Sequence, residues 1–236
     1  MCGRYVLKAN TQKLAETFQA DIGGLPAEIE AYNVAPGSYM PIVTLSGKTH
    51  RTLTLSRWGL VPHWAKDEKR AYSMINARSE SLVEKPSFRN AFYQRRCIVP
   101  ANGFYEWKAT GGAGRKTADA GTGKQPYYIH PSSDAWMAMA GLYEHWKTPD
   151  GTTLQTFTII TTSATSQLSP LHDRMPALLT PAEIEIWMDP LAKEPDRLLE
   201  VLHPFRADTL VIDAVSKEVN NSRNQGTHLI QPSTLF

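Results

Sequence analysis

The alternation of hydrophobic and polar residues predicts a chain rich in β-strands. Residues 51–58 (RTLTLSRW) place Leu53 and Leu55 between polar neighbours, which is the two-residue period of a strand with one buried face. Further strands are predicted at residues 96–100, 103–108, 126–130, 135–143, 154–162 and 209–212. The predicted strands come in clusters and do not alternate regularly with helices, so the pattern favours an antiparallel α+β fold over a doubly wound parallel sheet.

Three segments show the spacing of an α-helix. Residues 11–20 place two hydrophobic side chains four positions apart, with Asn10 or Thr11 as the N-cap. A capping box that begins at Thr180, followed by proline at the first helical position, predicts a second helix. A third helix is predicted from Pro195 to Leu202.

The composition is that of a folded globular chain. Of the 236 residues, 42% are hydrophobic and 20% are charged, which excludes disordered, collagen-like and coiled-coil chains. No apolar stretch approaches the ~20 residues needed to cross a bilayer, and the first ten residues lack the apolar run of a signal peptide. We therefore expect one domain spanning residues 1–236, located in the cytoplasm and without membrane contact.

The charge is nearly balanced overall but uneven along the chain. Lys and Arg number 25 and Asp and Glu number 23, which leaves a formal charge of +2. Residues 1–100 contain 14 basic and 8 acidic side chains, whereas residues 101–236 contain 11 and 15. Between Lys66 and Arg96, eight basic residues face four acidic ones. A basic region of this kind fits a polyanion such as nucleic acid.

Residues 110–124 (TGGAGRKTADAGTGK) form a glycine-rich segment between two predicted strands. A phosphate-binding P-loop needs glycine directly before the lysine, Ser or Thr after it, and a following helix. Here Arg115 precedes Lys116 and Gln125 follows Lys124, so that pattern is not met. We therefore expect a flexible hairpin insertion.

The two cysteines must be interpreted separately. Two are too few for a disulfide framework, and they lack the paired spacing of a structural zinc site. The seven histidines show no metal-binding spacing either, so we expect neither a metal nor a cofactor. Cys97 lies in the apolar segment RRCIVP and is expected to be a small buried hydrophobic residue.

Cys2 is preceded only by the initiator Met1, which aminopeptidases remove when the second residue is small. The processed chain would then begin with an α-amine of pKa near 7.7–8.0 beside a thiol of pKa near 8.5. Such an amine condenses with an aldehyde to a Schiff base, and the thiol can close a thiazolidine ring on it. The same pair could act as an N-terminal nucleophile in amide hydrolysis. An accidental cysteine at a frayed terminus is the plain alternative.

Loops rich in polar, aromatic, glycine and proline residues accompany Cys2. Gly3 supplies a flexible hinge, and Arg4 supplies a guanidinium able to bind a phosphate through two hydrogen bonds. The further motifs are YNVAPG (32–37), RWGLVPHW (57–64), INARSE (75–80), NGFYEWK (102–108) and HDRMP (172–176). Loops of this composition build functional sites more often than cores.

With these motifs in this order, from MCGRY at the start to NQGTHLIQP at 224–232, the chain resembles the SRAP family, named for SOS-response-associated peptidases. The resemblance covers essentially the whole chain. It implies a single domain with a curved, barrel-like antiparallel β core flanked by helices, and a groove for single-stranded DNA. It also implies that the mature N-terminal cysteine, here Cys2, forms a thiazolidine with the open-chain aldehyde of an abasic site.

The resemblance suggests three further catalytic residues. Asn76 in INAR would hold atoms derived from the sugar. Glu106 in YEW, on a predicted strand beside Tyr105 and Trp107, would be partly desolvated and would shuttle a proton during Schiff-base formation. His172 in HDR would protonate the leaving sugar oxygen and assist reopening of the ring. A turn asparagine and a solvent-facing glutamate are the structural alternatives for the first two.

The resemblance also suggests a set of DNA contacts. The DNA-binding candidates are Arg4, Asn33, Pro36, Trp64, Arg78, Thr161 and Arg174. The three arginines would bind phosphates, and Asn33 and Thr161 would make polar contacts near the abasic position. Pro36 and Trp64 would form an apolar wedge against neighbouring bases, because stacking tolerates any sequence. Trp64 could equally be a core residue.

Three functions stay open at this point. The first is capture of abasic sites in single-stranded DNA by a covalent cross-link that protects the lesion, with reversal and weak lyase activity. The second is a thiol peptidase that processes its own N-terminus with Cys2, Glu106 and His172. The third is a noncovalent single-strand binder whose affinity falls with salt. We expect a monomer whose partner is single-stranded DNA containing abasic sites, and which associates with the nucleoid when bound.

Overall fold

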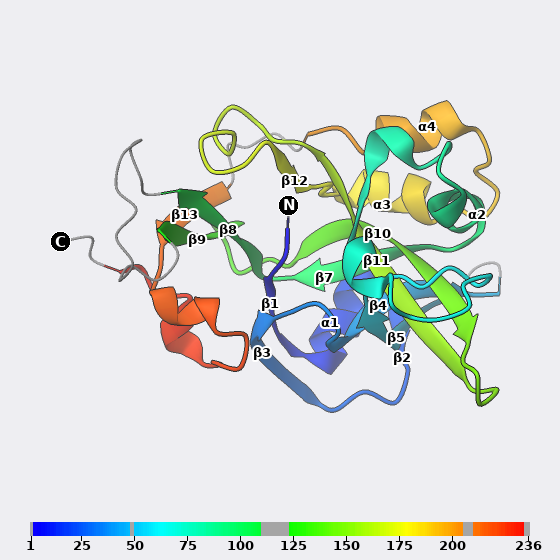
Figure 1. Ribbon diagram of the computed structural model, residues 1–236, viewed down its shortest axis with the longest axis horizontal. Coiled ribbons are helices and arrows are strands. Elements are labelled where there is room, and N and C mark those ends of the chain that lie inside the picture. Colours follow the sequence, from blue (N-terminus) through cyan, green and yellow to red (C-terminus); the bar gives the residue numbers. More distant parts are fainter. Residues whose placement is uncertain (1, 48–49, 110–122, 205–209, 234–236) are drawn as a thin grey trace.

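Five strands of the computed structural model close into a β-barrel. Their order is β5–β4–β7–β10–β11, and β11 pairs back onto β5 (Figure 1). The strands are β4 (Tyr39–Ser46), β5 (His50–Trp58), β7 (Arg96–Ala101), β10 (Met137–Lys147) and β11 (Thr153–Ser163). The closing pair of β11 with β5 is parallel, and the other pairs of the ring are antiparallel. The expected α+β class with a barrel-like core is confirmed.

The structure describes residues 2–47, 50–109, 123–204 and 210–233. The expected glycine-rich insertion at 110–124 lies outside these residues, apart from its last two positions. Within the described ranges, no helix is both long enough and apolar enough to cross a membrane.

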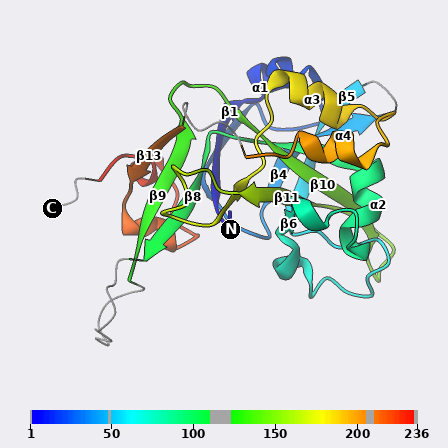
Figure 2. The same ribbon diagram turned by 90° about the horizontal axis from the view of Figure 1, so that it is seen from above.

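A second, antiparallel sheet stands beside the barrel. Its order is β13–β9–β8–β1–β3, and Figure 2 shows the start of β1 between this sheet and the barrel. The strands are β1 (Tyr5–Asn10), β3 (Glu28–Val34), β8 (Gly103–Ala109), β9 (Lys124–Pro131) and β13 (Leu210–Ala214). Because β1 pairs with β8 through Tyr5 and Phe104, the first residues of the chain run along the side of β8.

Four α-helices lie around the two β-sheets. They are α1 (Thr11–Phe18), α2 (Pro86–Gln94), α3 (Pro181–Met188) and α4 (Pro195–Glu200). The predicted N-cap of α1 is confirmed, since Asn10 Oδ1 accepts the Lys13 amide at 3.1 Å. The helix ends two residues earlier than predicted because Gln19 adopts a left-handed φ of 51°. The predicted capping box of α3 is present between Thr180 and Glu183.

An aromatic stack fills the core below the start of the chain. Tyr5 meets Trp58 edge-on with ring centroids 5.2 Å apart, and Trp58 stacks on Phe157 at 6.3 Å. All three side chains are buried, and the Trp58 indole donates a hydrogen bond to the Ile75 carbonyl at 2.9 Å. The stack therefore links β1, β5 and β11 to the segment that leads into Asn76.

Two short strands flank the end of β11. The strand β6 (Asn76–Arg78) pairs with β11 in parallel, with Arg78 opposite Thr161. The strand β12 (Arg174–Pro176) pairs with the same end of β11 in antiparallel fashion, with Pro176 opposite Thr161. The INAR and HDRMP motifs, about a hundred residues apart in the sequence, thus lie on the two edges of one strand.

The remaining short elements complete the fold. The strand β2 (Ala20–Ile22) pairs in parallel with β5, and 3-10 turns occur at Ala71–Met74, Ser79–Ser81, Lys217–Asn220 and Thr227–Leu229. The last two belong to a segment, residues 216–230, that packs against β1 and β3. Val219 and Leu229 are buried there with Tyr32.

Candidate functional site

Cys2 lies in the hydrophobic core, which argues against a frayed terminus. Its side chain is fully buried, in the same core cluster as Tyr5 and Trp58. The thiol donates a long hydrogen bond of 3.8 Å to the carbonyl oxygen of Arg4. Burial raises the pKa of the Cys2 thiol, and the negative charge of Glu106 raises it further. The thiol is therefore protonated at neutral pH, and its use as a nucleophile needs a base.

Glu106 faces inward from β8 and is only 5% exposed. Its burial agrees with the expected partial desolvation and excludes the solvent-facing alternative. The Tyr105 amide donates to the Arg4 carbonyl at 3.0 Å, which ties the start of the chain to the strand that holds Glu106. The carboxylate is thereby close enough to the Cys2 sulfur to act on its ionisation.

Asn76 holds the backbone of Cys2. Its Nδ2 donates a hydrogen bond of 2.8 Å to the Cys2 carbonyl oxygen. The Oδ1 atom of the same amide is buried and accepts no hydrogen bond from any described residue. The amide therefore fixes one atom of Cys2 and retains an acceptor for a donor that the described residues do not provide.

His172 precedes β12 and is about one third exposed. Its Nδ1 accepts the Arg174 amide at 2.9 Å and also lies 2.7 Å from a carboxylate oxygen of Asp173. A single ring nitrogen cannot do both, because it accepts from the amide only when unprotonated and donates to the carboxylate only when protonated. Each protonation state of His172 thus has a partner in place, which suits a residue that exchanges protons.

Arg174 is engaged within the protein. Its two terminal nitrogens donate to the Glu80 carboxylate at 2.6 and 2.9 Å, and one also donates to the Thr161 carbonyl. Hydrogen bonding to Arg174 lowers the pKa of Glu80. A DNA phosphate that binds Arg174 must compete with this carboxylate.

Arg78 is the exposed arginine of the group, and among the described residues its guanidinium has no partner. It lies opposite Thr161, whose hydroxyl is fully buried and donates to the Ala77 carbonyl at 3.5 Å. Arg78 is therefore available to a phosphate, whereas the Thr161 side chain faces the protein interior.

Arg4 and Asn33 bind the C-terminal segment together. Arg4 donates to Asn33 Oδ1 at 2.7 Å and to the Val219 carbonyl at 2.9 Å. Asn33 is buried, and its Nδ2 donates to three carbonyl oxygens, those of Val219, Asn221 and Asn224. Burial also lowers the pKa of Arg4. Both residues therefore have a structural role in addition to any contact with DNA.

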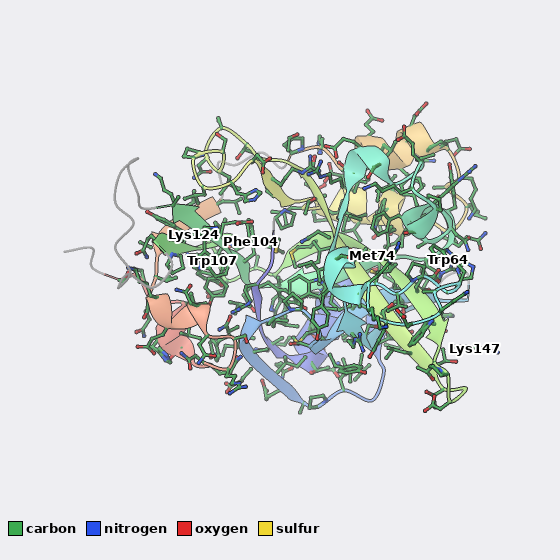
Figure 3. All side chains as sticks on the ribbon, in the orientation of Figure 1. Trp64, Met74, Phe104, Trp107, Lys124 and Lys147 are labelled. Carbon is green, nitrogen blue, oxygen red and sulfur yellow. The ribbon has the colours of Figure 1, made fainter. Side chains whose placement is uncertain are left out.

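The candidate wedge residues lie on loops, and Pro36 is half-buried. Trp64 is 52% exposed, so the core alternative is excluded. Along the long axis of the molecule, Figure 3 places Trp64 beyond Met74 on the side away from Trp107. Pro36 belongs to a turn in which Gly37 has a φ of +90°, and the Gly37 amide donates to the Trp58 carbonyl at 2.8 Å.

Sequence reasoning missed Tyr72, an exposed aromatic residue that lies against this turn. Tyr72 is 72% exposed, and its ring lies against Gly37, where a Cβ would be 3.5 Å from the phenol oxygen. It is four residues before Asn76 on a 3-10 turn. Its sequence neighbourhood (KRAYSM) has no aromatic or proline pattern that would single it out; only its exposure does.

The basic region between residues 66 and 96 is less exposed than its sequence indicates. Arg95 forms an ion pair with the buried Glu144 at 2.6 Å. Arg96 is 6% exposed, and its guanidinium donates to backbone carbonyls, among them those of Trp187 and Phe92. These two charges stabilise the fold and do not contribute to a DNA-binding surface. Cys97, next in sequence, is fully buried as predicted.

No group of three or more His, Cys, Asp or Glu side chains within the described ranges is arranged to hold a metal ion.

Among the candidate site residues, the structure brings Cys2, Glu106 and Asn76 together. It also connects Asn76 through β11 to Arg78, Thr161 and Arg174. Arg4 and Asn33 adjoin the same chain start.

Comparison with known proteins finds one matching family and relatives with a shared name. The family model described as SOS response associated peptidase (SRAP) matches residues 1–222. The protein named abasic site processing protein YoqW, from Bacillus subtilis (strain 168), is 42% identical over 232 residues, 98% of this chain and 99% of its own. The protein named abasic site processing protein HMCES, from Rattus norvegicus, is 31% identical over 87% of this chain and 66% of its own length.

Two solved structures have the same fold as this chain. A protein from Bacteroides thetaiotaomicron superposes with a TM-score of 0.84 at 28% identity, covering 98% of this chain and 100% of that one. A phage-related protein from Bordetella bronchiseptica gives a TM-score of 0.69 at 27% identity, covering 92% and 95%.

Proposed function

The chain belongs to the SOS response associated peptidase family, and we propose that it captures abasic sites in single-stranded DNA through a covalent bond to Cys2. The names of the relatives support the lesion as the target, since proteins matching 87–98% of this chain are named for abasic site processing. The observation on which the proposal depends is that buried Cys2 has its carbonyl held by the Asn76 amide and its thiol pKa raised by the negative charge of Glu106.

The chemistry requires Cys2 to carry a free α-amine, so Met1 must first be removed. The amine then adds to the aldehyde of the open-chain sugar, and loss of one water gives an imine. The Cys2 sulfur adds to the imine carbon while the thiol proton ends on the nitrogen. A five-membered thiazolidine results, and both nucleophiles come from one residue, so no second encounter is needed.

Glu106 serves as the base in this sequence. Because burial keeps the Cys2 thiol protonated, the proton must leave the sulfur as the carbon–sulfur bond forms. The nearby carboxylate takes this proton and returns it to the nitrogen, so Glu106 ends the cycle unchanged.

Asn76 positions the reacting amine. Its Nδ2 holds the Cys2 carbonyl, and its Oδ1 has no donor among the described residues. Accepting an N–H from the processed α-amine would satisfy this oxygen and orient the amine toward the aldehyde. His172, with a partner for each protonation state, protonates the sugar oxygen and assists ring reopening, which makes the link reversible and permits weak lyase activity.

Single-stranded DNA is the proposed partner, bound by a monomer. Arg78 is free to bind a phosphate, and Arg174 and Arg4 adjoin the same site. The exposed aromatic rings Trp64 and Tyr72 suit stacking on bases of any sequence.

The test is incubation with a single-stranded oligonucleotide that contains one abasic site, followed by a denaturing gel. We expect an adduct whose mass is the sum of Met1-free protein and DNA less one water. Cys2→Ala should abolish the adduct and Cys97→Ala should retain it. An adduct that persists in Cys2→Ala would refute the proposal.

A second candidate, a thiol peptidase that processes its own N-terminus with Cys2, Glu106 and His172, is favoured by the family's description. A variant with an alanine inserted between Met1 and Cys2 distinguishes the peptidase from the cross-linking function. The insertion removes the α-amine from the residue that holds the thiol, so it abolishes thiazolidine formation. It leaves thiolate attack on an amide possible.

A further inference from the structure

The imidazole of His63 is held in place by a buried carboxylate. Its Nδ1 lies 2.8 Å from an oxygen of Glu144, and the backbone amide of His63 donates to the same oxygen at 3.4 Å. Glu144 lies on β10 and is 3% exposed, whereas the His63 side chain is 49% exposed. A carboxylate only accepts hydrogen bonds, so Nδ1 carries the hydrogen and Nε2 is left for other contacts.

The second ring nitrogen of His63 is available to a ligand. Within the described residues, Nε2 has no hydrogen-bonding or ionic partner. Because Nδ1 keeps its hydrogen, Nε2 accepts a hydrogen bond in the neutral ring and donates one only in the protonated ring. Histidine side chains change their charge between about pH 5 and pH 8. An acceptor such as a phosphate oxygen can therefore bind Nε2 only when the ring is protonated.

A proton on His63 adds a net positive charge to this place. Arg95, directly after α2, lies with its Nε 2.6 Å from the second oxygen of Glu144, so the guanidinium already balances the buried carboxylate. With His63 neutral, the three side chains have a formal charge of zero; with His63 protonated, their formal charge is +1. The β11 side chains that face this loop, Leu154 and Thr156, carry no charge.

The rest of the loop adds no unbalanced negative charge. The charged side chains that follow His63 are Lys66, Asp67, Glu68, Lys69 and Arg70, and all are exposed. The two acidic members are paired, Glu68 with Arg57 at 2.5 Å and Asp67 with Lys69 at 3.7 Å. The loop therefore suits an anionic ligand.

The neighbour of His63 is the exposed Trp64. The loop is fixed on both sides of this indole, by Glu144 at His63 and by the Trp146 indole, which donates to the Ala65 carbonyl at 2.7 Å. Trp64 itself is 52% exposed. A base that stacks on it would bring its own phosphate close to the preceding residue, whose Cα is about 3.8 Å away along the chain.

We propose that protonated His63 binds a phosphate of single-stranded DNA beside the base that stacks on Trp64, and that Glu144 positions the ring for this contact. The inference rests on the proposed function, which supplies DNA as the ligand. Binding then takes up a proton wherever His63 is neutral in the free protein, so the affinity for DNA rises as the pH falls. The contact is noncovalent and does not involve Cys2.

The test is binding of an undamaged single-stranded oligonucleotide, which has no aldehyde and cannot react with Cys2. Fluorescence anisotropy at about pH 5.5 and about pH 8, each over a salt series, compares the parent with His63→Gln. At the lower pH the variant should bind about tenfold more weakly, and its slope of log affinity against log salt should be smaller by about 0.7. At the higher pH both quantities should agree between the two proteins.

Two further variants separate the charge of His63 from the shape of its loop. His145→Gln removes an exposed histidine that follows Glu144 on β10 and points to the other face of the strand, so it should bind like the parent at both pH values. His63→Arg keeps a donor for Glu144 and is permanently charged. It should bind more tightly than the parent at the higher pH and equal the parent at the lower pH.

Three results would overturn the inference. One is equal binding of the parent and His63→Gln at the lower pH, and another is an equal loss in His63→Gln at both pH values. The third is a His63→Arg variant that binds no better than His63→Gln.

Cross-linking of the parent to an abasic oligonucleotide is measured separately. If no adduct forms while the pH-dependent difference is present, covalent capture fails and the phosphate contact of His63 stands. If the adduct forms without that difference, the inference about His63 fails alone.

Discussion

The carboxylate of Glu80 accepts hydrogen bonds from both terminal nitrogens of Arg174, at 2.6 and 2.9 Å. This is the fork geometry with which arginine binds a phosphate. The two residues are 94 positions apart and meet because β6 and β12 lie on the two edges of β11. In the free protein, Glu80 therefore occupies the guanidinium that we propose as a DNA phosphate contact.

Glu80→Gln should therefore bind single-stranded DNA more tightly than the parent. With one more cation available, the slope of log affinity against log salt should steepen by about 0.7, the value per phosphate contact for single strands. Fluorescence anisotropy at several salt concentrations measures both quantities. Weaker binding with an unchanged slope would show that Glu80 instead orients Arg174.

The same pair predicts a pH dependence of stability. Arg174 lowers the pKa of Glu80 in the folded state, so the contribution of the pair is fully present above the unfolded glutamate pKa of about 4.3. It is lost as the pH falls through the lower folded value. Melting temperatures of the parent and Glu80→Gln should therefore differ at neutral pH and converge in acid. A difference that stays constant into acid would contradict this account.

Glu106→Gln should change two properties of Cys2 in opposite directions. Removing the negative charge removes one cause of the raised thiol pKa, so alkylation of Cys2 at neutral pH should become severalfold faster. Cross-linking to abasic DNA should become slower, since the base is lost. Cys97, whose pKa is raised by burial alone, is the internal control. Parallel changes in both rates would refute the assignment of Glu106 as base.

Tyr72→Ala should weaken binding to single-stranded DNA without affecting the fold. Loss of one stacked base contact costs about 1–3 kcal/mol, which is roughly fivefold to 150-fold in affinity. Because the Tyr72 side chain is 72% exposed, the melting temperature of the Tyr72→Ala variant should match that of the parent protein. Leu191→Ala, 77% exposed on a different loop, serves as the control. If Tyr72→Ala and Leu191→Ala bind single-stranded DNA with equal affinity, Tyr72 is not part of the DNA-binding surface.

Arg96→Met should destabilise the protein by about 3 kcal/mol, because carbonyls of Trp187 and Phe92 lose a charged donor inside the fold. Arg89→Met, an exposed neighbour from the same basic run, should change stability by less than about 0.5 kcal/mol. Urea titration monitored by tryptophan fluorescence provides both values. Similar losses in the two variants would contradict the structural role of Arg96.

Local signals in the sequence predicted the elements that depend on local interactions. The capping box at Thr180 and the N-cap at Asn10 are formed by residues three apart, so α3 and α1 could be identified directly. The strands β1 and β3 were missed because flanking polar residues mask them, and Pro41 interrupts the pattern of β4. Helix α2 was not predicted, because it lacks a polar N-cap: the Lys85 side chain makes no capping hydrogen bond.

The candidate site was predictable in its residue types and not in its contacts. Motif order placed Cys2, Asn76 and Glu106 in one site, but the burial of Cys2 depends on strand pairing over a hundred residues. The inward turn of Arg96 and the pairing of Arg174 with Glu80 depend on tertiary contacts of the same kind. Charge counted along a sequence does not distinguish such arginines from those in solvent.

The pairing of strand β11 limits where insertions and deletions can occur in this chain. It pairs with β5, β6, β10 and β12, so four neighbours fix its alignment at once. Inserting or deleting a single residue within it would exchange its two faces, open the ring and separate the halves of the site together. Length variation among natural versions of this chain should therefore accumulate after Ser163 or before Thr153 and spare the strand itself.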